Sequence, residues 1–166
     1  AKLVHANKIL EIGTYYGHST LALAAALPQG GKLISIEHNP KFAAVAKEHL
    51  TAANVADKVE IRVGEAPLLL PEIERDHAKE SFDLVFVDAD KRHFKDYWEA
   101  SLRLVKKDGL IIFDNALARG EILNDSPDAA DHIAAVRSFN DHVKSDPRVF
   151  SYIATLADGM LTALKL

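Results

Sequence analysis

Acidic and amide side chains follow two apolar runs in the second half of the chain. Asp88 comes directly after the run 82–87, and Asp114 and Asn115 come after the run 109–113. Both runs have the length and composition of buried strands, and neighbouring parallel strands lie about 4.8 Å apart. Two carboxylates and an amide carbonyl at adjacent strand ends are hard oxygen ligands, suited to Mg²⁺, Mn²⁺ or Ca²⁺. Helix capping explains one such acid but not three oxygen donors, so the pattern predicts a divalent-cation site.

Lys91 lies three residues after Asp88. The ammonium form of a lysine is disfavoured beside a divalent cation, which lowers its pKa towards that of a general base. The stretch 91–93 is charged throughout, however, and spacing alone favours a solvated lysine there.

A glycine turn and a lone acid follow two runs in the first half of the chain. Gly13 and Gly17 allow a tight turn from strand to helix and close approach of a ligand. Their spacing lacks the third glycine of the G-x-G-x-x-G dinucleotide fingerprint, and with it the pyrophosphate cradle. Glu37, at the end of the second run, is suited to accept hydrogen bonds from ribose hydroxyls, although by itself it is equally compatible with a capping or surface acid. Together, the glycine turn and Glu37 favour a ligand that contains a nucleoside but no pyrophosphate. S-adenosylmethionine is the obvious candidate.

Short apolar runs alternate with helical patterns, which predicts a parallel sheet covered on both faces. In such a sheet, ligands bind beyond the carboxyl ends of the strands. Strands are expected near residues 8–13, 32–37, 59–64, 82–88 and 109–114. Helices are expected near residues 18–27, 40–53, 66–74, 92–106 and 129–144, with a loop over 116–128. Two further strands, 149–155 and 160–166, flank Asp158-Gly159, and an Asp-Gly pair between such runs is typical of a hairpin.

The composition of the chain argues against several classes of protein and of functional site. The 166 residues suit one domain, and the net charge of −4 gives no general attraction to nucleic acid or an anionic membrane. The absence of cysteine excludes disulfides, thiolate metal sites and cysteine nucleophiles. No apolar stretch approaches the ~20 residues of a membrane span, and no signal-peptide pattern is present. A cytoplasmic location is the expectation.

These residues together resemble a known family, the metal-dependent class I O-methyltransferases, which includes catechol and caffeoyl-CoA O-methyltransferases and bacterial relatives. The matching segments are Leu10–Thr14 with Gly17 and Ser19, the acid at Glu37, Phe86–Lys91, Phe113–Asn115 and Asp158-Gly159. The resemblance implies one Rossmann-like, doubly wound α/β domain over residues 1–166. Its sheet would have seven strands, mostly parallel, with an antiparallel C-terminal strand. It also implies a homodimer and additional cap helices that would precede Ala1.

The resemblance also assigns roles to individual residues. Contacts with S-adenosylmethionine are implied for Glu11, Gly13, Tyr15, Ser19, Glu37, Ala66 and Asp90. The implied metal ligands are Asp88, Asp114 and Asn115. Lys91 becomes the candidate catalytic base, and Arg119 borders the acceptor.

The function expected from these features is methyl transfer from S-adenosylmethionine to a hydroxyl of a small aromatic vicinal diol, assisted by a divalent cation such as Mg²⁺. One alternative is methylation of a hydroxylated uridine in transfer RNA, which the acidic composition disfavours because RNA-binding proteins usually carry a basic surface. A second is a S-adenosylmethionine-binding module without catalysis. A nicotinamide-dependent dehydrogenase is disfavoured by the missing third glycine.

Overall fold

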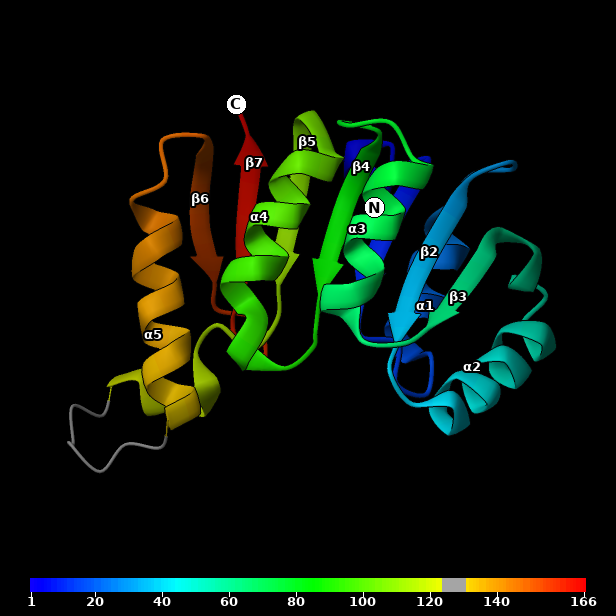
Figure 1. The fold of residues 1–166 in the computed structure, drawn as a ribbon, viewed down its shortest axis with the longest axis horizontal. Coiled ribbons are helices and arrows are strands. Elements are labelled where there is room, and N and C mark those ends of the chain that lie inside the picture. The colour runs from blue at the N-terminus through cyan, green and yellow to red at the C-terminus, as the bar shows by residue number, and fades with distance from the viewer. Residues whose placement is uncertain (124–130) are drawn as a thin grey trace.

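The chain forms a single seven-stranded sheet (Figure 1), seen in a computed structural model that describes residues 1–123 and 131–166. The strands are β1 (Lys8–Ile12), β2 (Lys32–Glu37), β3 (Val59–Val63), β4 (Phe82–Val87), β5 (Val105–Phe113), β6 (Val149–Ala154) and β7 (Met160–Lys165). Their order in the sheet is β3-β2-β1-β4-β5-β7-β6. Strands β1 to β5 pair in parallel, whereas β7 is antiparallel to both β5 and β6. The predicted mostly parallel sheet with an antiparallel C-terminal strand is confirmed.

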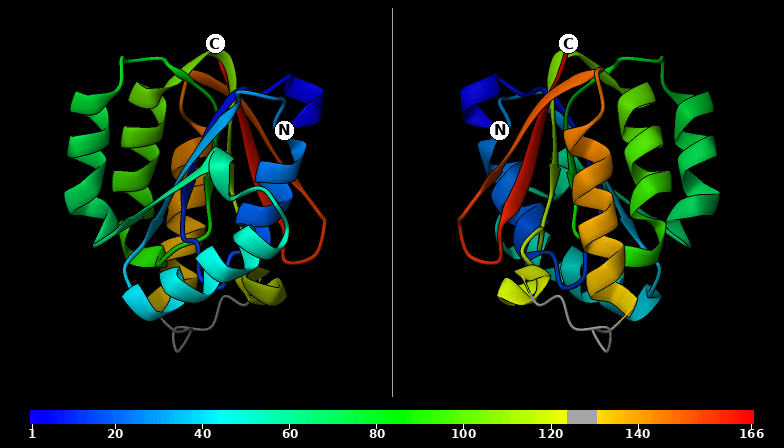
Figure 2. Two further views of the ribbon diagram at one scale, coloured as in Figure 1. Left: turned by 90° about the vertical axis from the view of Figure 1, so that its right-hand side faces the viewer. Right: turned by 90° about the vertical axis from the view of Figure 1, so that its left-hand side faces the viewer.

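Helices cover both faces of the sheet (Figure 2). On one face lie α3 (Ala66–Asp76), α4 (Phe94–Leu104) and α5 (Asp131–Lys144), and on the other lie α1 (His18–Ala26) and α2 (Pro40–Ala52). Four short 3₁₀ segments complete the described elements: η1 (Lys2–Val4), η2 (Ala56–Lys58), η3 (Lys91–His93) and η4 (Ala118–Leu123). Within the described residues, no helix is long and apolar enough to cross a membrane.

Local sequence sets where the first two helices begin. Gly17 precedes α1 with φ 86°, a left-handed conformation that costs glycine little. Asn39 caps α2 by accepting a hydrogen bond from the Lys41 amide at 2.9 Å, and Pro40 occupies the first helical position. Both starts therefore lie at the carboxyl end of a strand.

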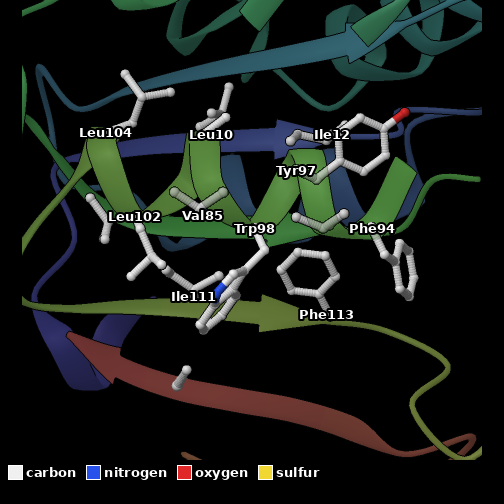
Figure 3. Close-up of a cluster of buried hydrophobic side chains, with 14 of the residues drawn as sticks. Leu10, Ile12, Val85, Phe94, Tyr97, Trp98, Leu102, Leu104, Ile111 and Phe113 are labelled. Carbon is white, nitrogen blue, oxygen red and sulfur yellow. The ribbon is translucent and has the colours of Figure 1, made fainter. Parts of the chain in front are cut away.

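The main core lies between the sheet and α4 (Figure 3). Trp98 and Phe113 are fully buried, and Phe113 packs against Phe94 and Phe139 with ring centroids 5.0 and 4.6 Å apart. Burying one such aromatic side chain contributes on the order of 2–3 kcal/mol. This packing fixes α4, and with it the segment between β4 and α4, relative to the ends of β4 and β5.

The boundary between α4 and β5 differs from the prediction. A helix was expected over 92–106, but α4 ends at Leu104 and β5 already begins at Val105. Val105 pairs with Phe82, while Leu110 pairs with Leu84, so the register shifts between these pairs. The predicted break at 107–109 is thus an irregularity within one strand, where Asp108 has φ 61°.

The described part of the predicted loop at 116–128 includes η4, which is interrupted by the non-helical residues Arg119 and Gly120. Residues 124–128, and the first two residues of the helix expected at 129–144, lie outside the described residues. The predicted hairpin around Asp158-Gly159 is confirmed by the antiparallel pairing of β6 with β7.

Asp146 joins the end of α5 to α4 through a buried carboxylate. Its Oδ2 accepts hydrogen bonds from Trp98 Nε1 at 2.9 Å and from an Arg148 guanidinium nitrogen at 2.6 Å. The bonds from Arg148 and Trp98 hold the pKa of Asp146 below its usual range. The ionised carboxylate therefore stabilises the fold at neutral pH.

Replacing Asp146 with asparagine should lower the free energy of unfolding at neutral pH by about 1–2 kcal/mol, because Arg148 and Trp98 lose a charged acceptor. The folded pKa is depressed, so this contribution is complete above the ordinary aspartate pKa of about 4 and is lost as the pH falls further. Urea unfolding across pH should therefore show the two proteins converging below about pH 4. Glu99→Gln, which removes a more exposed partner of Arg148, should cost less than about 1 kcal/mol. A constant difference down to strongly acidic pH would contradict this assignment.

Candidate functional site

The strand order reverses between β1 and β4, and a cavity of about 200 Å³ opens beyond the carboxyl ends of these strands. This switch point is where open α/β sheets bind ligands. The cavity, called here the cofactor cavity, is lined by Ile12, Gly13, Tyr15, Ile36, Glu37, His38, Phe42, Gly64, Glu65, Ala66, Asp88, Ala89, Asp90 and Tyr97. Five of the seven residues predicted to contact the cofactor are in this lining.

The glycine turn after β1 is held against the neighbouring strands. Gly13 has φ 105°, and its amide donates to the Ile36 carbonyl at 3.0 Å. A Cβ at this position would overlap the carbonyl oxygen of Asp88. Glycine is therefore required where the backbone after β1 meets the backbone after β4.

Glu37 is the acid at the floor of the cofactor cavity, and its side chain is only 4% exposed. Its Oε2 accepts a hydrogen bond from the Tyr15 amide at 2.7 Å, and its Oε1 accepts one from the Asn39 amide at 2.9 Å. The Oε1 atom also lies 3.2 Å from Nδ1 of the exposed His38, whereas Oε2 can accept a further hydrogen bond. The geometry thus fixes Glu37 while leaving it able to receive a ligand hydroxyl.

Glu11 and Ser19 lie beneath the glycine turn and are not part of the cavity lining. Glu11 is fully buried, and its Oε2 accepts hydrogen bonds from the hydroxyls of Thr20 and Ser35, both at 2.5 Å. Burial raises the pKa of Glu11, and hydrogen bonding from the hydroxyls of Ser19, Ser35 and Thr20 opposes this rise. The predicted contact of Glu11 with the cofactor stays a prediction.

Asp90 is held at the edge of the cofactor cavity by one side chain from η3 and one from α4. Its Oδ2 accepts a hydrogen bond from the Tyr97 hydroxyl at 2.7 Å, and its Oδ1 lies 2.8 Å from His93 Nδ1. Burial opposes ionisation, but these hydrogen bonds outweigh it and lower the pKa of Asp90. Tyr97 is a member of the site that the sequence did not reveal, because its bond to Asp90 depends on how α4 packs.

The β4–β5 pairing places the residues predicted to bind a metal after neighbouring strands, and their role as ligands stays a prediction. Val87 and Phe113 are partners in the β4–β5 ladder, and the Asp114 amide donates to the Val87 carbonyl at 2.9 Å. Asp88 and Asp114 therefore directly follow two paired residues at the ends of adjacent strands. Asn115 follows with φ 62°, and its amide donates to Asp114 Oδ1 at 2.7 Å.

The Lys91 ammonium lies among these oxygen donors. Its Nζ donates to Asn115 Oδ1 at 2.7 Å and lies 3.8 Å from Asp88 Oδ1. Burial and the nearby Asp114 raise the pKa of Asp88, opposed by Lys91. Burial lowers the pKa of Lys91 despite the surrounding carboxylates. Asp88 and Asp114 are thus two carboxylates that repel each other and lie near one positive charge. Such an arrangement is suited to binding a cation.

A second cavity, of about 290 Å³, lies on the other side of these residues. Called here the acceptor-side cavity, it is lined by Lys91, Asn115, Ala118, Arg119, Glu121, His132, Val136 and Asp158. Arg119 is one of these lining residues, and its contact with an acceptor stays a prediction. Sequence analysis missed His132 and Asp158 as members of this site, because they come from α5 and the β6–β7 turn.

Two other features of the described residues do not form part of this site. A larger groove, of about 650 Å³, lies beside α5 and the β6–β7 edge and is lined by none of the predicted site residues. Glu99, His142 and Asp146 lie close enough together to suggest a metal site. There, however, Arg148 already neutralises the carboxylates by bonding to both Asp146 and Glu99.

Sequence comparison relates the whole chain to one family. Residues 1–166 match the family model described as O-methyltransferase. A catechol O-methyltransferase from Niastella koreensis is 36% identical over 169 residues, covering 99% of this chain and 76% of the relative. A catechol O-methyltransferase from Mycobacterium tuberculosis is 41% identical over 138 residues, covering 83% of this chain and 60% of the relative.

Solved structures show the same similarity. The O-methyltransferase TomG from Streptomyces achromogenes, in complex with S-adenosylmethionine, superposes with a TM-score of 0.89 at 36% identity, covering 99% of this chain and 75% of TomG. An O-methyltransferase from Bacillus cereus, in complex with S-adenosylhomocysteine, gives a TM-score of 0.88 at 32% identity, covering 99% of this chain and 76% of that chain.

Replacing Glu37 with alanine should weaken binding of S-adenosylhomocysteine by about 10- to 100-fold, the cost of losing a charged acceptor in a buried setting. Isothermal titration calorimetry measures this directly. Glu37→Gln, which keeps one acceptor oxygen, should bind with intermediate affinity, and Glu48→Ala, an exposed change on α2, should bind normally. Unchanged affinity in a folded Glu37→Ala protein would show that Glu37 does not contact the cofactor.

Proposed function

The chain belongs to the O-methyltransferase family, and on that basis we propose that it methylates one hydroxyl of a small aromatic compound with two adjacent hydroxyls, with help from a divalent cation. As a S-adenosylmethionine-dependent enzyme, it would bind the methyl donor in the cofactor cavity and the diol in the acceptor-side cavity.

The proposal rests mainly on one group of polar side chains that lies between the two cavities. Asp88 lines the cofactor cavity, Asn115 and Lys91 line the acceptor-side cavity, and Lys91 bridges Asp88 and Asn115. An acceptor hydroxyl and the methyl donor could therefore meet at this group. The catechol O-methyltransferases among the relatives support an adjacent diol as the acceptor.

The donor set fits a hard divalent cation. Asp88, Asp114 and Asn115 would hold it through two carboxylates and an amide oxygen, which is the ligand type that Mg²⁺ prefers and which Mn²⁺ and Ca²⁺ also accept. When bound, the cation would act as a Lewis acid that lowers the pKa of the acceptor hydroxyl.

Lys91 would take the proton from the acceptor hydroxyl. Burial lowers its pKa, so its neutral amine is more accessible than that of an ordinary lysine. The Lys91 Nζ also lies 4.8 Å from the centre of the Phe94 ring, a contact that helps to orient the side chain. Glu37 and the glycine turn would orient the methyl donor, so that catalysis rests largely on holding the two reactants in line.

Replacing either Asp88 or Asp114 with asparagine should reduce methyl transfer to a catechol by at least about 100-fold, because a charged ligand of the cation is lost. Chelation by EDTA should do the same to the unaltered chain, and added Mg²⁺ should restore its activity. Binding of S-adenosylhomocysteine, measured by calorimetry, should stay nearly unchanged in the Asp114 variant. Asp96→Asn, an exposed change on α4, is the matched control. Full turnover in chelator would refute metal assistance.

Replacing Lys91 with methionine should lower kcat by about 100- to 10,000-fold, the usual contribution of a general base. Lys91→Arg should be similarly inactive, because a guanidinium keeps the positive charge but cannot accept a proton. Lys95→Met, an exposed change on α4, serves as the control. Recovery of activity by arginine would mean that Lys91 acts through its charge alone.

The same assays separate the proposal from its alternatives. Methyl incorporation into bulk RNA but not into any catechol would favour a nucleic-acid acceptor. Cofactor binding without turnover on a panel of diols or on RNA would favour a binding module.

A further inference from the structure

We propose that Asp158, in the turn between β6 and β7, is a positioning residue that holds the loop 115–120 in the conformation presenting Asn115 and Arg119 to the acceptor-side cavity. The inference rests on the proposed function for the identity of the acceptor. The placement of the loop itself rests on hydrogen bonds within the fold.

The loop 115–120 has an unusual backbone. Asn115, Ala118 and Arg119 have φ values of 62°, 46° and 55°, and Gly120 has φ 83°. A left-handed alanine or arginine costs about 1–2 kcal/mol, whereas asparagine and glycine adopt this conformation more readily. Contacts from elsewhere in the fold must therefore hold the loop in place, and they decide where its side chains point.

The β6–β7 turn supplies such contacts. The amides of Ala116 and Leu117 donate to the carbonyls of Gly159 and Asp158, both at 2.9 Å. The Arg119 amide donates to the carboxylate oxygen Oδ1 of Asp158. A Cβ at Gly159 would overlap the Leu117 side chain, so the turn and the loop are in close contact.

The carboxylate of Asp158 makes a contribution that the backbone cannot replace. The two carbonyl acceptors belong to the main chain and persist after substitution at 158, whereas the bond to Arg119 is made by the side chain. Arg119 lies at the centre of the strained segment and lines the acceptor-side cavity together with Asp158. Losing this bond would let Arg119 leave its left-handed conformation and would change the wall of the cavity.

The test compares Asp158→Ala with Asp158→Asn, because asparagine keeps an acceptor oxygen for the Arg119 amide while removing the charge. The acceptor is a catechol bearing a carboxylate, whose adjacent hydroxyls give two distinguishable methyl ethers. The readouts are kcat and KM for the diol, the ratio of the two ethers, the affinity for S-adenosylhomocysteine, and hydrogen exchange of the peptide covering 115–120. Asp141→Ala, an exposed change on α5, is the control.

We expect Asp158→Ala to lower kcat/KM for the diol by about 10- to 100-fold, as misplacement of an acceptor by about 1 Å can do. It should also give a mixture of ethers and faster exchange in the loop, while cofactor affinity stays within about twofold of the unaltered chain, a change of only about 0.4 kcal/mol. Asp158→Asn should restore the ether ratio and the slow exchange. Unchanged exchange and ether ratio in Asp158→Ala, or an asparagine variant as impaired as the alanine one, would overturn the inference.

If the proposed function is wrong, the same experiment gives a different result. The unaltered chain would then methylate no diol, and the inference would be judged by hydrogen exchange alone. Faster exchange of the loop in Asp158→Ala, reversed in Asp158→Asn, would still support a positioning role. Equal exchange in all three proteins would still overturn it.

Discussion

The close approach of Gly13 to the backbone of Asp88 is the contact on which the rest of the site depends. It brings the turn after β1 against the segment after β4, at the position where the strand order reverses. Glu37 is tied to the same turn through the Tyr15 amide, and Asp114 is tied to β4 through the Val87 carbonyl. The groups that would hold the methyl donor and those that would hold the cation are therefore joined through contacts that each involve the main chain.

Burial and hydrogen bonding shift the pKa values of the carboxylates in this site in opposite directions. Glu11 and Asp88 have raised pKa values because burial disfavours their ionised forms. Asp90 has a lowered pKa because Tyr97 and His93 stabilise its carboxylate. Carboxylates within one site thus meet different environments, which allows them to serve different partners. In this arrangement Asp90 stays charged at the cavity edge, whereas Asp88 gains from a nearby positive charge.

The sequence predicted the sheet and the acidic residues at the strand ends because both depend on where strands end. Asp88, Asp114 and Glu37 follow apolar runs, and parallel pairing brings such strand ends to one edge of the sheet. The start of β5 at Val105 was mispredicted because 92–106 reads as one amphipathic helix, and only pairing with Phe82 shows otherwise. The roles of Tyr97 and Asp158 could not be predicted, since each depends on a hydrogen bond between elements whose packing no local pattern encodes.

The dependence of the loop 115–120 on the β6–β7 turn has a consequence for how the protein is made. All residues that line the cofactor cavity stand at or before Tyr97 in the sequence. The loop, by contrast, must wait for Asp158 and Gly159, close to the carboxyl terminus of the chain. Because chains are synthesised from the amino terminus at about 5–20 residues per second, the loop can reach its final conformation only some seconds after the last residue of the cofactor cavity has been added.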